Sequence, residues 1–507
     1  MTKREEVSRI NQEQRERLTV RDSNPHPTTP MLWVVSAAQS TYMTKEVREK
    51  IDGKWVARTI YVPFLGEGSA PLHQNLYDGL RRMMKERDVG SEMLICPTAG
   101  KCQAEDVLHE SVEHLPELYP AWRKGYFSFN DNIQLSDILV PPQNVDPTTG
   151  KTKLPAKYGS TLVFPHSKQR FRPVAVYQAD FPRYLLTTGM VTLPNYNQYN
   201  AKGDQAAKDH RLGAVLVETI DGNYFNMRTL RARMDGSFVD MGLKYNGDRK
   251  PERVKVKALD ASDVHIGEHD PRALEATLEQ IEFFKPERLI LHDFFSGYSI
   301  SHHELANRIE RARLFRDGKL DLRKELELNM KYLKEFSKAM KGREIYIVHS
   351  NHHDFLPKYL NSPQSADDLW NFEMNAMITS RMPRQDGYLE EALKLIGQIP
   401  SNVQFLRLSS NLVVGGYQLA SHGHLGKNGA RGGGVSSQEE SFGKGIFGHS
   451  HSPEIKGDIY RVGTMLSPET SYMQGASSAS MAANGVLYEN DTVQLLPMIN
   501  GKWKAKF

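Results

Sequence analysis

The stretch RVKVKALDASDVH, residues 253–265, decides the fold that we expect for the C-terminal half of the chain. Its apolar residues alternate with lysines, so that Val254 and Val256 share one face, and this alternation predicts a β-strand. Asp263 and His265 follow at the end of the strand. Residues two apart in a strand project to the same side, so both side chains would point at one place. The stretch therefore predicts a strand that ends in a pair of candidate metal ligands.

Four more groups of polar residues follow along the chain, each at the end of a run that predicts a strand. They are Asp293 at the end of RLILHD, Asn351 to Asp354 after EIYIVHS, His422 at the end of YQLASH, and His449 and His451 in GIFGHSH. Open α/β sheets place their active sites at the ends of strands. Carboxylate, imidazole and amide groups suit Mn²⁺, Fe²⁺ or Zn²⁺, and the lack of thiolates argues against a structural zinc cluster. One such residue alone is usually structural, but the five groups together predict a metal site.

The order of the five groups resembles the signature of the calcineurin-like metallophosphoesterases: D-x-H, then G-D, then G-N-H followed by Asp or Glu, then H, then G-H-x-H. The resemblance covers about residues 254–470. It implies two divalent metal ions, with Mn²⁺ as the expected ion and Mg²⁺, Fe²⁺ or Zn²⁺ as alternatives. Two positions depart from the signature, because His292 and Ser350 stand where the family has glycine.

The resemblance also implies a role for each matching residue. The implied ligands are Asp263, His265 and His451 for one metal ion, and Asn351, His422 and His449 for the other. Asp293 would bridge the two ions. His352, directly after Asn351, best matches the catalytic histidine of the family, and His353 stays an alternative. Two metal ions close together lower the pKa of a shared water, which can then attack phosphorus without a covalent enzyme intermediate.

Composition sets only broad limits on the protein class. The chain has 507 residues, of which 39% are hydrophobic and 25% charged, enough for two to four domains with their own cores. Cys96 and Cys102 are its only cysteines, which excludes a disulfide framework. The charged N-terminus lacks the apolar segment of a secretory signal, and no apolar run approaches the ~18 residues of a membrane span. We therefore expect a cytoplasmic protein without membrane contact, in the host cytoplasm if it is viral.

Changes in the hydrophobic pattern and segments rich in proline and glycine divide the chain into an expected arm and two regions. The fold class that we predict is α/β. Residues 1–30 would form an N-terminal arm, and residues 31–250 an accessory region that is first α/β and then β-rich. Residues 251–507 would form a four-layer α/β/β/α metallophosphoesterase domain, as the resemblance implies. The accessory region carries no motif that decides its role, and it could bind DNA, form a homo-oligomer or recruit a partner.

Several local patterns predict individual elements. Helices are expected at about residues 72–88, 106–115, 270–284 and 320–341. Ser365 and Asp368 resemble a capping box that would open a further helix. Asp221-Gly222 lies between two strand-like runs, which predicts a β-hairpin.

The site defines a reaction class, and other features bear on the substrate. The chain lacks the G-D-x-x-D-R-G motif of the protein Ser/Thr phosphatases. The motif set also occurs in DNA repair nucleases, and the whole chain resembles the early-expressed DNA-degradation proteins of large tailed phages. Our leading hypothesis is a metal-dependent DNA nuclease. The alternatives are a phosphomonoesterase or small-nucleotide phosphodiesterase, and a metal-binding scaffold without activity.

A glycine-rich segment between two of the candidate ligands could contact a polynucleotide. Residues 423–445 contain Lys427 and Arg431, and a flexible basic loop here could grip a phosphate backbone, although a disordered surface loop is an equal alternative. His303 and its neighbour His302 could face the substrate or begin a helix. Arg228 in the β-rich region could extend the basic track, although such charges more often lie on a solvated surface.

Overall fold

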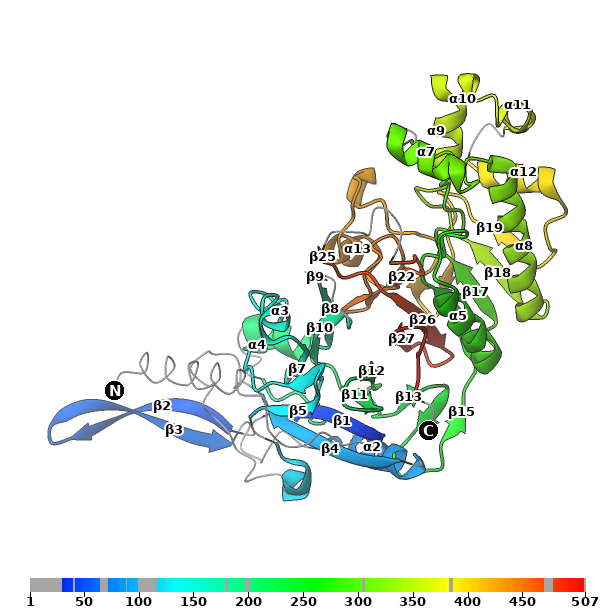
Figure 1. Cartoon of the computed structure of the whole chain (residues 1–507). Coiled ribbons are helices and arrows are strands. Elements are labelled where there is room, and N and C mark those ends of the chain that lie inside the picture. Colours follow the sequence, from blue (N-terminus) through cyan, green and yellow to red (C-terminus); the bar gives the residue numbers. More distant parts are fainter. Residues whose placement is uncertain are drawn as a thin grey trace. The chain divides into compact units, whose positions relative to one another are not determined.

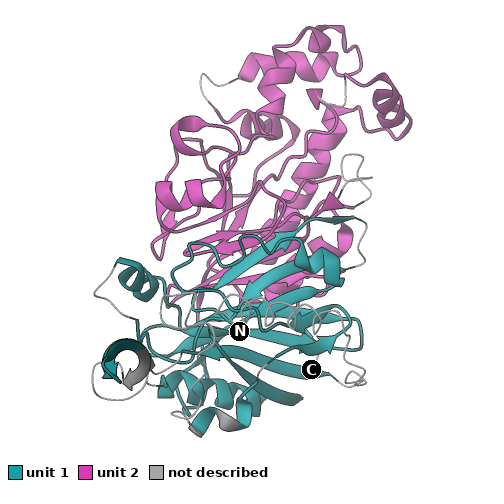
Figure 2. Cartoon of the chain, turned by 90° about the vertical axis from the view of Figure 1, so that its left-hand side faces the viewer, with its two compact units in different colours: residues 1–254, 504–507 teal, residues 255–503 magenta. Residues whose placement is uncertain are grey.

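The computed structural model describes residues 30–39, 42–63, 72–87, 89–98, 116–123, 125–177, 181–196, 201–302, 306–382, 386–468 and 477–505. The predicted arm, apart from its last residue, and the predicted helix at 106–115 lie outside these residues. The fold is mixed α/β with several sheets. The chain divides into two compact units, residues 1–254 with 504–507 and residues 255–503 (Figure 2). The domain boundary predicted after residue 250 is not tested by this division and stays a prediction. We describe each unit by itself.

The first sheet of unit 1 has a buried face that one helix covers. Its strands, in spatial order, are β12 (Phe225–Arg231), β11 (Gly213–Thr219), β1 (Met31–Ala38) and β4 (Gly90–Pro97). Helix α2 (Gln74–Glu86) packs Leu76 and Leu80 into the same core as Leu32 and Ile95. Strands β11 and β12 pair antiparallel across Asp221-Gly222, so the predicted hairpin is confirmed.

A long hairpin extends away from this sheet (Figure 1). It consists of β2 (Tyr42–Ile51) and β3 (Lys54–Pro63), which pair antiparallel over their whole length. Asp52 and Gly53 form its turn with φ values of 49° and 79°. A two-residue turn with positive φ at both positions matches the right-handed twist of the strands, and Asp-Gly is a preferred sequence for it.

Most of the remaining strands of unit 1 lie in its second half and confirm the β-rich character predicted there. One group has the order β8-β10-β7-β6-β5, and another the order β13-β14-β15. Their bounds are β5 (Phe127–Asn130), β6 (Ile133–Leu135), β7 (Thr161–Phe164), β8 (Arg170–Val174), β10 (Arg183–Thr187), β13 (Phe238–Asp240), β14 (Leu243–Tyr245) and β15 (Glu252–Arg253). Two short helices, α3 (Leu154–Tyr158) and α4 (Ala201–Lys208), lie between them in the chain.

Arg228 is not part of a surface track, and that expectation is wrong. Its side chain is buried, with Nε 2.6 Å from Asp240 and Nη2 2.8 Å from Glu218. Burial opposes the charge, but the two carboxylates hold the pKa of Arg228 well above its usual range. A buried arginine needs such partners, because an unpaired charge in the interior is costly. The sequence pattern could not distinguish this buried arginine from an exposed one.

The first sheet of unit 2 carries the strand that the opening stretch predicted. In spatial order it contains β19 (Val403–Phe405), β18 (Glu344–Ile347), β17 (Arg288–Leu291), β16 (Val256–Ala261), β26 (Ala482–Tyr488) and β27 (Val493–Met498). The first four strands are parallel, and β26 and β27 are antiparallel to their neighbours. Helices α5 (Pro271–Phe284) and α8 (Leu322–Met340) lie side by side against this sheet (Figure 1). Both helices were predicted.

A second group of strands in unit 2 packs on the first sheet. Its members are β20 (Val413–Val414), β21 (Tyr417–Gln418), β22 (Gly445–Phe447), β24 (Ile459–Arg461) and β23 (Glu454–Lys456). At Gly485 of β26, an added Cβ would lie 3.3 Å from Ile446 and 3.6 Å from Val462, so the two layers face each other here. Helix α13 (Val435–Phe442) contacts β22 and β24. The segment 423–445, which was predicted as a loop, therefore contains a helix. The helix begins after the glycines, where Ser, Gln and Glu follow in the sequence.

Short helices gather at one end of unit 2 (Figure 1). They are α7 (Arg308–Arg316), α9 (Phe355–Leu360), α10 (Pro363–Asp367), α11 (Phe372–Arg381) and α12 (Tyr388–Ile396). The predicted capping role of Ser365 is wrong, because Ser365 lies inside α10 and its hydroxyl donates to backbone carbonyls. Pro363 opens α10 instead, since proline fits the first position of a helix. Among the described residues, no helix is long and apolar enough to cross a membrane.

Candidate metal centre

The backbone brings the first two ligand groups together. Beyond the ends of β16 and β17 the two segments stay hydrogen-bonded, with Val264 N donating to His292 O at 3.0 Å and His265 N to Asp293 O at 2.8 Å. The neighbouring segment joins in the same way, since Val348 N donates to Leu291 O at 3.0 Å. Three successive parallel strands thus end at one edge, where the polar residues that follow them meet.

Backbone strain concentrates at this edge. His265, Asp293, His449 and His451 have φ values of 48°, 39°, 70° and 56°. Residues other than glycine rarely adopt positive φ, and such residues gather at functional sites, where the surrounding structure holds them. Four of the seven predicted ligands therefore adopt a conformation that costs folding energy.

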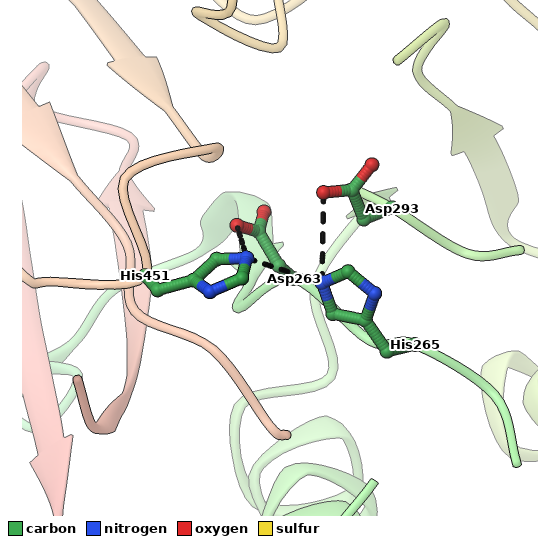
Figure 3. Close-up of side chains that lie close together, drawn as sticks. All are labelled: Asp263, His265, Asp293 and His451. Carbon is green, nitrogen blue, oxygen red and sulfur yellow. Dashed lines mark hydrogen bonds and ion pairs between the residues drawn. The ribbon is translucent and has the colours of Figure 1, made fainter. Parts of the chain in front are cut away.

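One cluster of four side chains could hold a cation. Asp263, His265, Asp293 and His451 each offer a ligand atom, and these atoms lie within 4.8 Å of one another. Nε2 of His265 lies 3.2 Å from Nε2 of His451 and 3.6 Å from Oδ2 of Asp293, while Nε2 of His451 lies 3.6 Å from Oδ2 of Asp263 (Figure 3).

Asp293 also faces the remaining predicted ligands. Its Oδ2 lies 3.1 Å from Nε2 of His422, whose ring is 5.3 Å from that of His449, centroid to centroid. Oδ1 of Asn351 is buried and has no hydrogen-bond partner among the described residues. Contacts around Asp293 thus link six of the seven predicted ligands, and the amide oxygen of the seventh is left unsatisfied among the described residues.

The environment of the two buried carboxylates shows whether a metal ion fits this cluster. Asp263 and Asp293 are almost completely buried, and no hydrogen bond of good geometry reaches their oxygens from the described residues. Unsatisfied carboxylates in the interior are costly, and a divalent cation removes that cost. Two carboxylates, imidazoles and an amide oxygen are donors that Mn²⁺, Fe²⁺ and Zn²⁺ accept. The residues present therefore fit a metal centre.

The electrostatics of the cluster favour the ligand forms of its side chains. Burial holds the pKa of His265 and of His422 well below the usual range and lowers that of His451 to about 4, so all three imidazoles are neutral at pH 7. Burial opposes ionisation of Asp293 too, but His422 and His352 hold its pKa well below the usual value. Burial and the nearby Asp293 raise the pKa of Asp263. The charge of a bound divalent cation would offset the repulsion between the two carboxylates, and any proton on Asp263 would be released on binding.

A cavity of about 1030 Å³ opens above these acids. Asn351, His449 and His451 line it, and so does His352, whereas His353 is buried and does not. Burial lowers the pKa of His353 to about 3. Nδ1 of His352 lies 2.7 Å from the carbonyl oxygen of Ser296, which can only accept, so Nδ1 carries the proton.

The candidate substrate contacts have different positions. Arg431 is exposed and lines the cavity, as does His302. The ammonium group of Lys427 pairs with Glu440, and Lys427 does not line the cavity. His303 lies outside the described residues. Sequence reasoning gave no role to His349, Lys358 or Tyr388, which also line the cavity, and His424 lines it too. A lone histidine, lysine or tyrosine carries no spacing that could have identified it.

Glu325 of α8 holds the loop that follows Asp293. Its Oε1 accepts from Gly297 N at 2.7 Å and its Oε2 from Ser299 N at 3.1 Å, and its side chain is fully buried. Burial outweighs these hydrogen bonds and raises the pKa of Glu325 from 4.5 to about 8.

The shifted pKa of Glu325 predicts a pH-dependent stability. Between pH 4.5 and about 8 the folded protein holds a proton on Glu325 that the unfolded chain has lost. The contribution of Glu325 to the free energy of unfolding is therefore fully present below pH 4.5 and is lost as the pH rises towards 8. In EDTA, the unfolding free energy of the wild type should fall relative to Glu325→Gln, by up to about 5 kcal/mol over that range. Urea unfolding at several pH values measures it, and parallel profiles for the two proteins would contradict it.

The fold and the site together define a mixed α/β protein with a buried centre that fits metal ions. Among curated proteins, the chain is similar to Protein A1 of Escherichia phage T5, with 28% identity over 349 residues. The match covers 66% of this chain and 62% of that protein, so the chain spans about three fifths of the length of its relative. No protein-family model matches the chain, and no solved structure does.

Proposed function

We propose that the chain is a dinuclear metal-dependent phosphodiesterase of the calcineurin-like type and that its substrate is DNA. The observation that carries this proposal is the position of Asp293. One of its oxygens lies 3.6 Å from Nε2 of His265 and 3.1 Å from Nε2 of His422, so a single carboxylate atom faces both predicted ligand sets. A shared carboxylate is what two metal ions close together require.

Two further findings support the proposed four-layer fold and the proposed relation to phage proteins. Helices α5 and α8 contact one sheet, the second layer of strands faces its other side at Gly485, and α13 contacts that second layer. This order supports the four-layer α/β/β/α domain. The similarity to a phage protein fits the predicted link to phages, and the choice of DNA follows from the predicted resemblance to phage DNA-degradation proteins.

The chain supplies the ligands and the groups around the reacting phosphate. Asp263, His265 and His451 would hold one ion, Asn351, His422 and His449 the other, and Asp293 both. When bound, the ions would supply a water of lowered pKa and would neutralise charge on the phosphate oxygens.

We assign the catalytic role to His352 and not to His353, because only His352 lines the cavity. The hydrogen bond from Nδ1 to the carbonyl oxygen of Ser296 fixes the ring of His352, and in the imidazolium form, with both nitrogens protonated, Nε2 is the atom that can give its proton to the leaving oxygen. Arg431 and Lys358 line the same cavity and would contact the phosphates of a polynucleotide.

The test is a set of substrates offered to purified protein with Mn²⁺, Mg²⁺ or EDTA. Linear duplex DNA, circular single-stranded DNA and p-nitrophenyl phosphate separate a nuclease from an enzyme for small esters. We expect DNA to be degraded with Mn²⁺ and to stay intact in EDTA, and the circular substrate reveals internal cleavage. Cleavage of the small ester alone would favour the phosphomonoesterase alternative. No cleavage by metal-loaded protein would favour the scaffold.

A further inference from the structure

His292, which stands where the resembled signature has glycine, lies inside unit 2 between two other polar side chains. It is fully buried. Its Nε2 lies 3.0 Å from Oδ1 of Asp260, and its Nδ1 lies 3.4 Å from Nδ1 of His422. A large polar residue at a buried glycine position needs a reason, because burying an imidazole is costly unless its nitrogens find partners.

Asp260 provides the partner on one side. It belongs to β16 and is fully buried, and no hydrogen bond of good geometry reaches its oxygens from the described residues, so its 3.0 Å contact with Nε2 of His292 is the polar contact on which the argument rests. An ionised carboxylate can only accept, so the nitrogen of His292 that faces it must carry the proton. His292 then has its proton on Nε2 and a free lone pair on Nδ1, the atom that faces His422.

His422 provides the partner on the other side. If its Nε2 is to hold a metal ion beside Asp293, that nitrogen must be unprotonated, and the proton of the neutral ring must be on Nδ1. Nδ1 of His292 lies 3.4 Å from Nδ1 of His422 and can accept that proton. Oδ1 of Asp263 lies farther away, at 3.8 Å, and the metal centre needs that oxygen for itself.

We propose that Asp260 and His292 are positioning residues that select the metal-binding tautomer of His422. In this arrangement the proton on Nε2 of His292 points to Asp260, and the proton on Nδ1 of His422 points to His292. The lone pair on Nε2 of His422 then remains for the metal ion. This inference rests on the proposed function, because it gives His422 the role of a ligand. Partners behind a ligating histidine are a general means of fixing its tautomer and orientation, and losing them typically weakens metal binding about 10- to 100-fold.

The test measures Mn²⁺ binding and does not depend on DNA cleavage. His292→Phe keeps a ring but has no acceptor, whereas His292→Asn places an amide oxygen near the position of Nδ1. Titration calorimetry and elemental analysis should find two Mn²⁺ per wild-type chain. In His292→Phe one of the two should bind about 10- to 100-fold more weakly. His292→Asn should bind both with affinities near those of the wild type.

Controls separate this inference from effects on folding. His210→Phe removes a buried histidine of unit 1, whose ring contacts Thr192 and Tyr196, and should leave both Mn²⁺ affinities unchanged. If His292→Phe does not fold, as judged by circular dichroism, His292→Leu replaces it, because leucine also lacks an acceptor.

Two results would overturn the inference. One is wild-type affinity for both ions in the variant without an acceptor, and the other is equal weakening in the Phe and Asn variants. A wild-type chain that binds no Mn²⁺ would instead overturn the proposed function.

Discussion

Replacing Asp293 by Asn should reduce Mn²⁺-dependent DNA cleavage by about 10³-fold or more. Metal ions contribute several kcal/mol to such reactions, and about 1.4 kcal/mol corresponds to a factor of ten in rate. Asn has the same size but lacks the charge, and its amide group would face His265 or His422, the two neighbours of Oδ2. The variant should therefore lose metal as well as activity. Initial rates on linear DNA and metal content by elemental analysis measure the two effects.

A matched substitution separates this effect from loss of charge in general. Asp321→Asn also exchanges a carboxylate of unit 2 for an amide, but at the start of α8, where Asp321 accepts from Lys324 N and where Asn caps equally well. It should retain wild-type activity. Mn²⁺ should raise the melting temperature of the wild type and of Asp321→Asn, but not that of Asp293→Asn. Full activity in Asp293→Asn would contradict the shared-carboxylate site.

The parts of the fold that sequence predicted are those that local patterns determine. The alternation around Val256 predicted β16, and the spacing of Leu322, Leu326 and Met330 predicted α8. Hydrophobic residues at strand or helix spacing must face a core, and this constraint acts within a few residues. The assignments around Ser365 and α13 were wrong because polar residues and glycines fit both loops and short helices.

The candidate site was predictable to the extent that its residues share strand ends. Asp263 and Asp293 were chosen because each follows an apolar run, and the continued pairing of β16 with β17 brings them together. The partners of His292 were not predictable, since Asp260 and His422 are 32 and 130 residues away and no local pattern joins them. Tertiary contacts of this kind appear only when the strands are placed side by side.

Gly448, which precedes His449, brings the backbone close to the candidate metal centre. A Cβ added there would lie 2.2 Å from Oδ1 of Asp263 and 3.0 Å from the ring and Cβ of His292. Both neighbours are fully buried, so neither can move away into solvent. Only glycine leaves room for the carboxylate in its present position. The glycine of the G-H-x-H motif is therefore a steric requirement here and not a conformational one.

Gly448→Ala should consequently reduce DNA cleavage by about 100-fold, the effect that a displacement of about 1 Å can have at a reacting centre. Displaced Asp263 should also bind Mn²⁺ more weakly, and the overpacking should cost about 1–3 kcal/mol of stability. Gly434→Ala is the matched control, because no atom lies within 4 Å of a Cβ at Gly434 and its φ of −76° suits alanine. Cleavage rates, Mn²⁺ titration and urea unfolding compare the two variants. Equal behaviour would show that Asp263 does not need its present position, and the assignment of Asp263 as a ligand would then be wrong.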